Sequence, residues 1–346
     1  MTAPKLVVAG QSVSFTIRTL LGQMYLVPDK DAEKQKMMGY LIGHALLKSD
    51  LVLHGFCAMS NHLHYTGTDI GANRDCFTRR FHGNLATKCN QLYERSGTFW
   101  GNMSEKTIMS QKAMVDKLLY DWLNPVKANL VARVDDWEGF MILPKHWGKP
   151  MTFERPSTFP EDTWPPSVTF TPMPPAFFHH MPLDEAIAFF EKKIAEKEAE
   201  YHNKRKTKVL GMRACFLVDP ASRPGEQVLS MREQRQARDR RRKLRLLSRR
   251  KRSPNQLPFA CDRADEDSNA RRYREFRKAY KEAREAYKQD KSTAFPFGTF
   301  LKVHRENAPC ASTTPSDRIL PSAYNNDYLA WYLARFGPDG HDAFFS

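Results

Sequence analysis

The chain has 346 residues, enough for two domains with a substantial buried core. Its 54 Lys and Arg outnumber its 39 Asp and Glu, which leaves a formal charge of +15 at pH 7. This excess favours a polyanionic partner, because cations that neutralise phosphates release condensed counterions. No apolar run approaches the ~18 residues of a membrane span, and the stretch at 6–9 is too short for a signal peptide. We therefore expect a soluble, intracellular protein without a membrane partner.

The first 144 residues alternate between strand-like and helix-like patterns. Apolar residues in alternation predict a strand at 13–17, and apolar residues at helical spacing predict a helix at 29–48. Further along we expect strands at 51–58, 62–68 and 98–100, a basic helix at 74–94, and a helix at 111–123 that Pro125 ends. This order predicts an α+β, ferredoxin-like domain, an antiparallel sheet with helices on one face.

Prolines become dense between residues 145 and 182, where no helix can persist. We interpret this segment as an ordered, extended connector and as the boundary between a domain at 1–144 and a basic, mainly helical region at 183–346. Within that second region, helices are predicted at 183–204, 232–252 and 269–288.

Six cysteines are scattered along the chain without any Cys-x-x-Cys pair. Such spacing excludes a zinc ribbon and a small secreted disulfide scaffold. We expect reduced and mostly buried thiols at positions 57, 76, 89, 215, 261 and 310.

Two histidines, His62 and His64, occupy alternate positions of a predicted strand. Residues i and i+2 of a strand face the same way, so the two imidazoles project together while Leu63 enters the opposite side. Neighbouring imidazoles at this spacing can share one divalent cation, with a free coordination position for a phosphate oxygen. Taken alone, such a pair is more often two unrelated surface residues.

A tyrosine and an asparagine lie one helical turn apart in the next predicted helix, at Tyr120 and Asn124. A mid-helix tyrosine is usually a core residue with its hydroxyl at the rim. A phenol becomes a useful nucleophile toward phosphorus only where the phosphate is positioned and its charge is reduced. A metal ion held by His62 and His64 meets that requirement, and Asn124 can supply a third, oxygen ligand.

These motifs resemble those of a known family. The run Met-Ser-Asn-His-Leu-His at 59–64 is similar to the HUH signature of single-tyrosine transposases, and Tyr-Asp-Trp-Leu-Asn-Pro-Val at 120–126 resembles the tyrosine helix of their REP-associated branch. The segments at 97–100 and 136–139 are also similar to that family, and Phe-Pro-Phe-Gly-Thr-Phe at 295–300 resembles a segment of its long form.

The resemblance implies a ferredoxin-like HUH nuclease domain that acts on single-stranded, hairpin-containing DNA with Mg²⁺ or Mn²⁺. Carried over by position, His62, His64 and Asn124 would be metal ligands and Tyr120 the nucleophile. Tyr120 would form a 5′-phosphotyrosine link and release a 3′-hydroxyl, and a later 3′-hydroxyl would reseal the strand without ATP. Asp121 departs from a favourable pattern, because its charge would repel a phosphate, and we expect it to point away from the site.

Basic residues outside these motifs are candidates for DNA contact. Arg79 and Arg80 are expected on the exposed side of the 74–94 helix, whose inward side includes Leu92, although a solvated helix face explains the two arginines equally well. The segment 232–252 holds twelve Lys or Arg, among them Arg240, Arg241, Arg242, Lys243, Arg249 and Arg250, and we interpret it as nucleic-acid-binding rather than a solvated helix.

Aromatic residues recur at helical spacing in the 269–288 helix, at 273, 276, 280 and 287. We expect them to form a packing seam rather than a base-stacking platform.

The sequence favours an enzyme, a tyrosine DNA nickase and strand transferase, acting as a monomer or homodimer at the nucleoid of a prokaryotic cytoplasm. The alternative is a domesticated, non-catalytic binder of hairpin DNA or RNA. A phosphodiesterase that uses water is a third possibility, but the chain lacks the clustered Asp and Glu of two-metal sites.

Overall fold

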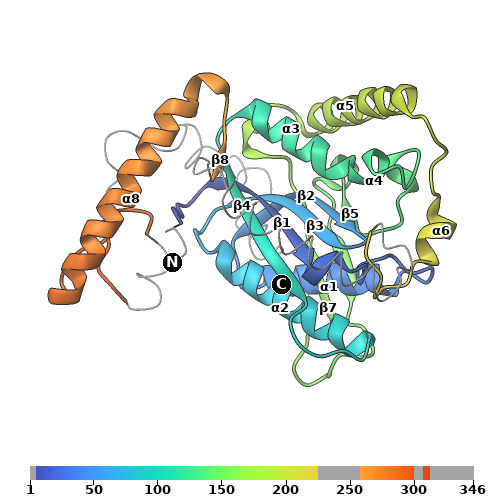
Figure 1. The fold of residues 1–346 in the computed structure, drawn as a ribbon, viewed down its shortest axis with the longest axis horizontal. Helices are drawn as coiled ribbons and strands as arrows, with labels where there is room; N and C mark the ends of the chain where they lie inside the picture. The colour runs from blue at the N-terminus through green and yellow to red at the C-terminus, as the bar shows by residue number, and fades with distance from the viewer. Residues whose placement is uncertain (1–4, 225–257, 300–306, 312–346) are drawn as a thin grey trace, which may run out of the picture.

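A computed structural model describes residues 5–224, 258–299 and 307–311 of the chain (Figure 1). Its centre is a six-stranded sheet in the order β5-β2-β3-β1-β4-β8. The strands are β1 (Gln11–Thr19), β2 (Leu51–Met59), β3 (His62–Asp69), β4 (Trp100–Ile108), β5 (Met141–Ile142) and β8 (Phe259–Ala260). All neighbours are antiparallel except β4 and β8, which pair in parallel.

The first six elements, β1-α1-β2-β3-α2-β4, form the expected α+β, ferredoxin-like unit. Helices α1 (Glu33–Leu46) and α2 (Arg74–Leu92) both cover one face of the sheet, with an apolar core between the layers. Phe15, Phe56 and Tyr65 lie at its centre: the Tyr65 ring centroid is 4.7 Å from that of Phe15 and 5.6 Å from that of Phe56.

The opposite face of the sheet is covered by a later group of helices. These are α3 (Gln111–Trp122), α4 (Asn124–Lys127) and α5 (Leu183–Lys204), which lie together in Figure 1. A second apolar core forms here, where the Phe190 ring lies 5.7 Å from Trp122 and 5.2 Å from Trp147. The region at 183–204 therefore packs against the helix that carries Tyr120.

The fourth strand differs from its prediction. A short strand was expected at 98–100, whereas β4 runs from Trp100 to Ile108 and most of its side chains are exposed or half-buried. Its Gly-Asn-Met-Ser-Glu-Lys-Thr sequence has no apolar alternation, and the strand is held by backbone pairing with β1. The prediction that Leu92 faces inward is also wrong, since this side chain is 55% exposed at the end of α2.

The proline-rich segment is ordered and contains a small sheet of its own. Strands β6 (Met151–Glu154) and β7 (Ser167–Phe170) pair as an antiparallel hairpin on α1. The contact is close, because a Cβ atom at Gly39 would lie 2.3 Å from the Phe153 ring and one at Gly43 would lie 2.6 Å from Val168. Glycine on α1 therefore makes room for this hairpin.

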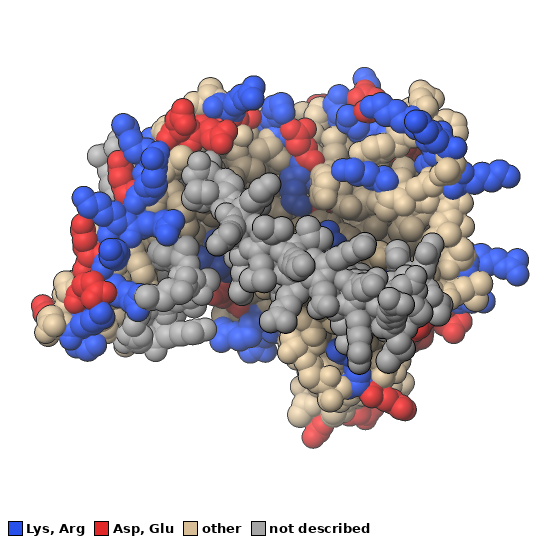
Figure 2. Space-filling model, viewed as in Figure 1, with Lys and Arg blue, Asp and Glu red and all other residues tan. Residues whose placement is uncertain are grey.

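Helix α8 (Glu266–Gln289) packs through its aromatic stripe, as predicted. Phe295 is fully buried, and its ring centroid lies 5.6 Å from Tyr280 and 5.3 Å from Tyr287. Figure 2 shows Lys and Arg alternating with Asp and Glu along the exposed side of this helix.

The remaining elements are short: η1 (Leu20–Gly22), η2 (Val134–Asp136), η3 (Pro144–His146), η4 (Ala176–Phe178), α6 (Met212–Phe216) and η5 (Arg263–Asp265). All six cysteines are free thiols, as predicted. Among the residues that the structure describes, no helix is both long and apolar enough to cross a membrane. The basic segment 232–252, with Arg240, Arg241, Arg242, Lys243, Arg249 and Arg250, lies outside the described residues.

Candidate active site

The two histidines lie side by side on the face of the sheet that α3 covers. His62 and His64 occupy the start of β3, and their ring centroids are 4.8 Å apart with the planes nearly perpendicular. Both side chains are buried, His64 almost completely. The strand period thus brings the imidazoles together as the sequence predicted.

Polar contacts orient both rings and favour one tautomer of each. The Asn61 amide oxygen is 2.6 Å from His62 Nδ1, and because this oxygen only accepts, Nδ1 carries the proton. The Nδ1 atom of His64 lies 2.9 Å from the Thr16 hydroxyl and 3.3 Å from a carboxylate oxygen of Asp121. In both rings the Nε2 lone pair is therefore left for another partner. His64 Nε2 is buried and has no hydrogen-bond partner in the described part of the chain.

Both imidazoles are neutral near pH 7. Burial lowers the pKa of His62 to about 4, with help from the charges of Arg18 and Lys117. Burial also lowers the pKa of His64 to about 2, and Lys117, His62 and Arg18 act in the same direction. A neutral ring with a free Nε2 lone pair is the form in which histidine binds metal ions.

Tyr120 lies beside this pair, near the end of α3. The helix begins at Ser110, whose hydroxyl accepts a hydrogen bond from the Ala113 amide at 3.2 Å. The Tyr120 ring centroid is 5.5 Å from that of His64, with perpendicular planes, and the side chain is 44% exposed. An exposed phenol is unusual for a mid-helix tyrosine and leaves its hydroxyl accessible to a substrate.

Two lysines flank the phenol ring. The Nζ atoms of Lys117 and Lys127 lie 5.2 Å and 4.9 Å from the ring centroid of Tyr120. Lys117 also bonds to Asp121, whereas Lys127 is exposed at the end of α4. Positive charge therefore surrounds the side of Tyr120 that solvent reaches.

Asp121 is fully buried, and its carboxylate contacts His64 Nδ1 instead of pointing away from the site as expected. Its carboxylate accepts hydrogen bonds from Lys117 and, at 3.1 Å, from the Thr66 hydroxyl. Burial raises its pKa to about 6, and Lys117 limits that rise. The contact with His64 Nδ1 was not predicted: instead of repelling phosphate, Asp121 orients a histidine from behind.

Asn124 is placed near Tyr120 by the helix end. Its amide nitrogen donates to the Tyr120 carbonyl oxygen at 2.9 Å, so the side chain caps the last turn of α3. The role of Asn124 as a metal ligand stays a prediction.

The donor set fits a metal ion with oxygen ligands in its remaining positions. Across residues 5–224, 258–299 and 307–311, no cluster of three or more His, Cys, Asp or Glu can hold a metal. Two oriented imidazoles with free Nε2 atoms can supply two ligands, and an amide, water or phosphate oxygen would have to complete the shell.

Arg18 was not singled out by sequence reasoning. It lies directly opposite His62 in the pairing of β1 with β3, and opposite residues of a strand pair share a face. By contrast, Arg79 and Arg80 are exposed on α2, which covers the other face of the sheet, so the fold does not bring them to the histidines. Strand alternation could have found Arg18 once β1 was known to lie beside β3.

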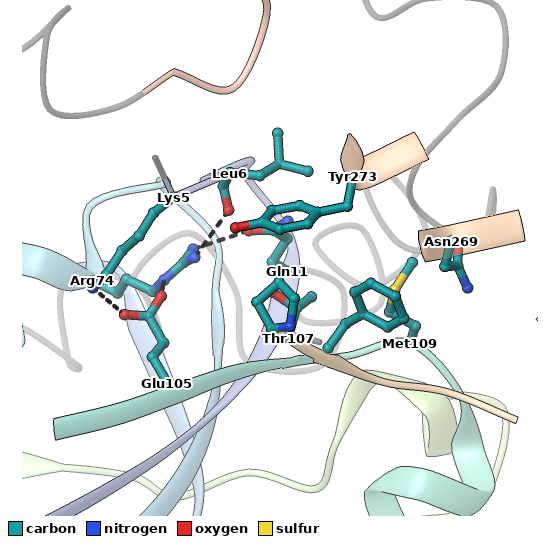
Figure 3. Close-up of a pocket in the computed structure, with 11 residues that line it drawn as sticks. Lys5, Leu6, Gln11, Arg74, Glu105, Thr107, Met109, Asn269 and Tyr273 are labelled. Atoms are coloured by element: carbon teal, nitrogen blue, oxygen red, sulfur yellow. Dashed lines mark hydrogen bonds and ion pairs between the residues drawn. The ribbon is translucent and has the colours of Figure 1, made fainter. Parts of the chain in front are cut away.

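A separate pocket lies where β4 and β8 meet α8 (Figure 3). At its floor, Arg74 bonds at 2.9 Å to both Glu105 and Asp69, and Lys5 bonds to Glu105 at 2.5 Å. Each cation is thus matched by a carboxylate. These buried ion pairs fix the sheet edge and leave no excess charge for a phosphate.

Neither a family model nor a curated protein matches this chain. Among solved structures, the chain is similar to a REP-associated tyrosine transposase bound to a REP hairpin. The sequence identity is 16%, the match covers 42% of this chain and 84% of that chain, and the TM-score is 0.33. A likeness this distant does not by itself indicate a function for this chain.

Proposed function

We propose that this protein is a single-tyrosine HUH nuclease and strand transferase related to the REP-associated transposases, acting on single-stranded DNA next to a hairpin. The observation that carries the proposal is the contact between Tyr120 and His64 at 5.5 Å between ring centroids, beside a second oriented imidazole. The sequence motifs at 59–64 and 120–126 support the same family.

In this mechanism His62 and His64 would hold Mg²⁺ or Mn²⁺ through their Nε2 atoms, with Asn124 as a candidate third ligand. When bound, the ion reduces the charge of the scissile phosphate and orients it. The Tyr120 oxygen forms a bond to phosphorus and gives its proton to solvent, while the bond to the 3′ oxygen breaks and that oxygen takes up a proton. The product is a 5′-phosphotyrosine link and a free 3′-hydroxyl, and the reverse attack by a 3′-hydroxyl reseals the strand.

The surrounding charges suit a phosphate at this position. Lys117 and Lys127 lie within 5.2 Å of the Tyr120 ring centroid, and Arg18 is on the same face beside His62. Cations aimed at the place where phosphate charge develops lower the barrier without reorganisation. Asp121 is buried 3.3 Å from His64 Nδ1, where it keeps the His64 ring in place.

The test is formation of a covalent adduct. Full-length protein, Mn²⁺ and a labelled hairpin oligonucleotide with single-stranded flanks should give an SDS-resistant complex that Tyr120→Phe cannot form. His64→Ala should abolish the adduct but keep most hairpin binding. An adduct that persists in Tyr120→Phe would refute the nucleophile assignment, and tight binding with no adduct in the wild type would favour the non-catalytic hairpin binder.

A further inference from the structure

The turn after β1 holds a leucine in an unusual backbone conformation. Leu21 has φ 61° and ψ 5°, the left-handed region, and its side chain is 60% exposed. A bulky residue is disfavoured in this region. Such strain persists only where the surrounding structure imposes it, and strained residues cluster at functional sites. Glycine would relieve the strain, as it does at Gly22, which has φ 76°.

Hydrogen bonds fix this turn to the residues that precede the histidine pair. The Asn61 carbonyl oxygen accepts from the Thr19 amide at 2.9 Å, and the Asn61 side chain donates to the Gly22 carbonyl at 3.0 Å. The same Asn61 side chain accepts from His62. One asparagine thus ties the strained turn to a candidate metal ligand, so Leu21 is held at a fixed place next to the site.

Arg18, three residues before Leu21, supplies a cation near the turn. Arg18 is exposed and lies opposite His62 in the strand pairing, on the same face of the sheet. The Arg18 side chain forms no hydrogen bond or ion pair with any residue in the described ranges. Lys117 differs in this respect, because its charge is matched by Asp121.

We propose that Arg18 and Leu21 form a nucleotide-binding subsite for the nucleotide next to the scissile phosphate of single-stranded DNA. Arg18 contacts the phosphate, and the exposed Leu21 side chain packs against the face of the base. This inference rests on the proposed function, since it names the part of the substrate that this edge of the site holds.

The chemistry of the two side chains fits such a ligand. An unpaired guanidinium forms bidentate bonds to phosphate oxygens. An unstacked base presents an apolar face, and leucine is one of the residues that proteins place against or between bases. Because the turn is rigid, little conformational entropy is lost when that contact forms.

The experiment measures binding and not cleavage. Full-length protein in EDTA is titrated with a fluorescent hairpin oligonucleotide whose single-stranded flank carries one abasic site, moved stepwise along the flank. Leu21→Gly and Leu21→Asn both tolerate the left-handed backbone but lack the apolar side chain. Leu92→Ala, at an exposed leucine on α2 across the sheet, is the matched control.

We expect Leu21→Gly and Leu21→Asn to weaken binding of the intact flank by about fivefold, less than full burial of a leucine side chain would give. At one particular position of the abasic site, the variants and the wild type should bind equally, because the base that Leu21 would contact is missing there. Arg18→Gln should weaken binding to all oligonucleotides and reduce the salt slope by about 0.7 for a single strand, while Arg18→Lys should restore most of that slope.

The Leu21 contact would be refuted if the Leu21 variants bind more weakly than the wild type by the same factor wherever the abasic site is placed. It would also be refuted if the variants bind the intact flank as tightly as the wild type does. An unchanged salt slope in Arg18→Gln would overturn the phosphate contact. Both results leave the Tyr120 adduct assay untouched, so they would refute the subsite alone. If the wild type does not bind the oligonucleotide at all, the subsite and the proposed function both fail.

Discussion

Replacing Asp121 by asparagine tests whether this carboxylate orients His64, the histidine that we propose as a metal ligand. The substitution Asp121→Asn keeps the shape of the side chain but removes its charge. The bond from Lys117 requires an acceptor, so the amide oxygen should take the place of Oδ1, and the amide nitrogen can donate to the Thr66 hydroxyl. The fold should therefore be kept. His64 Nδ1 still faces an oxygen at the Oδ1 position, but that oxygen no longer carries a negative charge, so the support of His64 is weakened and not abolished.

The size of the effect follows from the geometry around His64 Nδ1. Loss of a partner that orients a ligating histidine typically costs about 10- to 100-fold in metal affinity. Thr16 remains as the nearer partner, at 2.9 Å against 3.3 Å for Asp121. We therefore expect the lower end of that range, about tenfold or 1.4 kcal/mol.

The assay is the rate of adduct formation as a function of Mn²⁺ concentration. In Asp121→Asn the half-maximal concentration should rise about tenfold, and saturating Mn²⁺ should restore most of the rate. Asp116→Asn is a matched control on the same helix, because Asp116 is exposed and bonds only to Lys112 among the described residues. A metal requirement that does not change, or a rate that saturating Mn²⁺ fails to restore, would refute the role of Asp121.

Two further predictions concern stability. Burial lowers the pKa of His54 to about 4, so this residue should contribute a loss of about 3 kcal/mol in the unfolding free energy as the pH falls from about 6.5, the unfolded value, to about 4. His62 and His64 also have lowered pKa values and add to the loss in this pH range. His54→Gln should remove the share of His54 from a urea-unfolding pH profile, and an unchanged slope would assign the loss to other groups. Leu21→Gly should leave the unfolding free energy unchanged or raise it by up to about 1 kcal/mol, because relief of the left-handed strain offsets the entropy of glycine. Leu92→Gly, at an exposed leucine in a helix, should lower it by about 1 kcal/mol, and equal losses at the two leucines would argue against strain.

The core of the fold and the main site residues could be predicted because they follow local periodicity. His62 and His64 share a face through the strand period, and the elements of the ferredoxin-like unit follow apolar patterns. β4 was largely missed because a polar, half-exposed strand has no such pattern. This strand forms through its pairing with β1, a tertiary contact that local sequence does not indicate.

The supporting residues of the site could not be predicted, since their roles depend on pairs that are distant in sequence. Asp121 meets His64 only when α3 packs across β3, and Arg18 meets His62 only through strand register. The left-handed backbone of Leu21 has no sequence signal, because leucine is not a residue that marks such turns.

The glycines of α1 bear on how the protein can be dissected. Gly39 and Gly43 leave a shallow trough along the helix, and the 151–170 hairpin fills it with Phe153 and Val168. The Tyr40 hydroxyl also donates to the Pro165 carbonyl at 2.6 Å. A fragment cut at residue 144 would expose this trough to water and invite aggregation, so the smallest well-behaved fragment that carries Tyr120 has to extend past the hairpin.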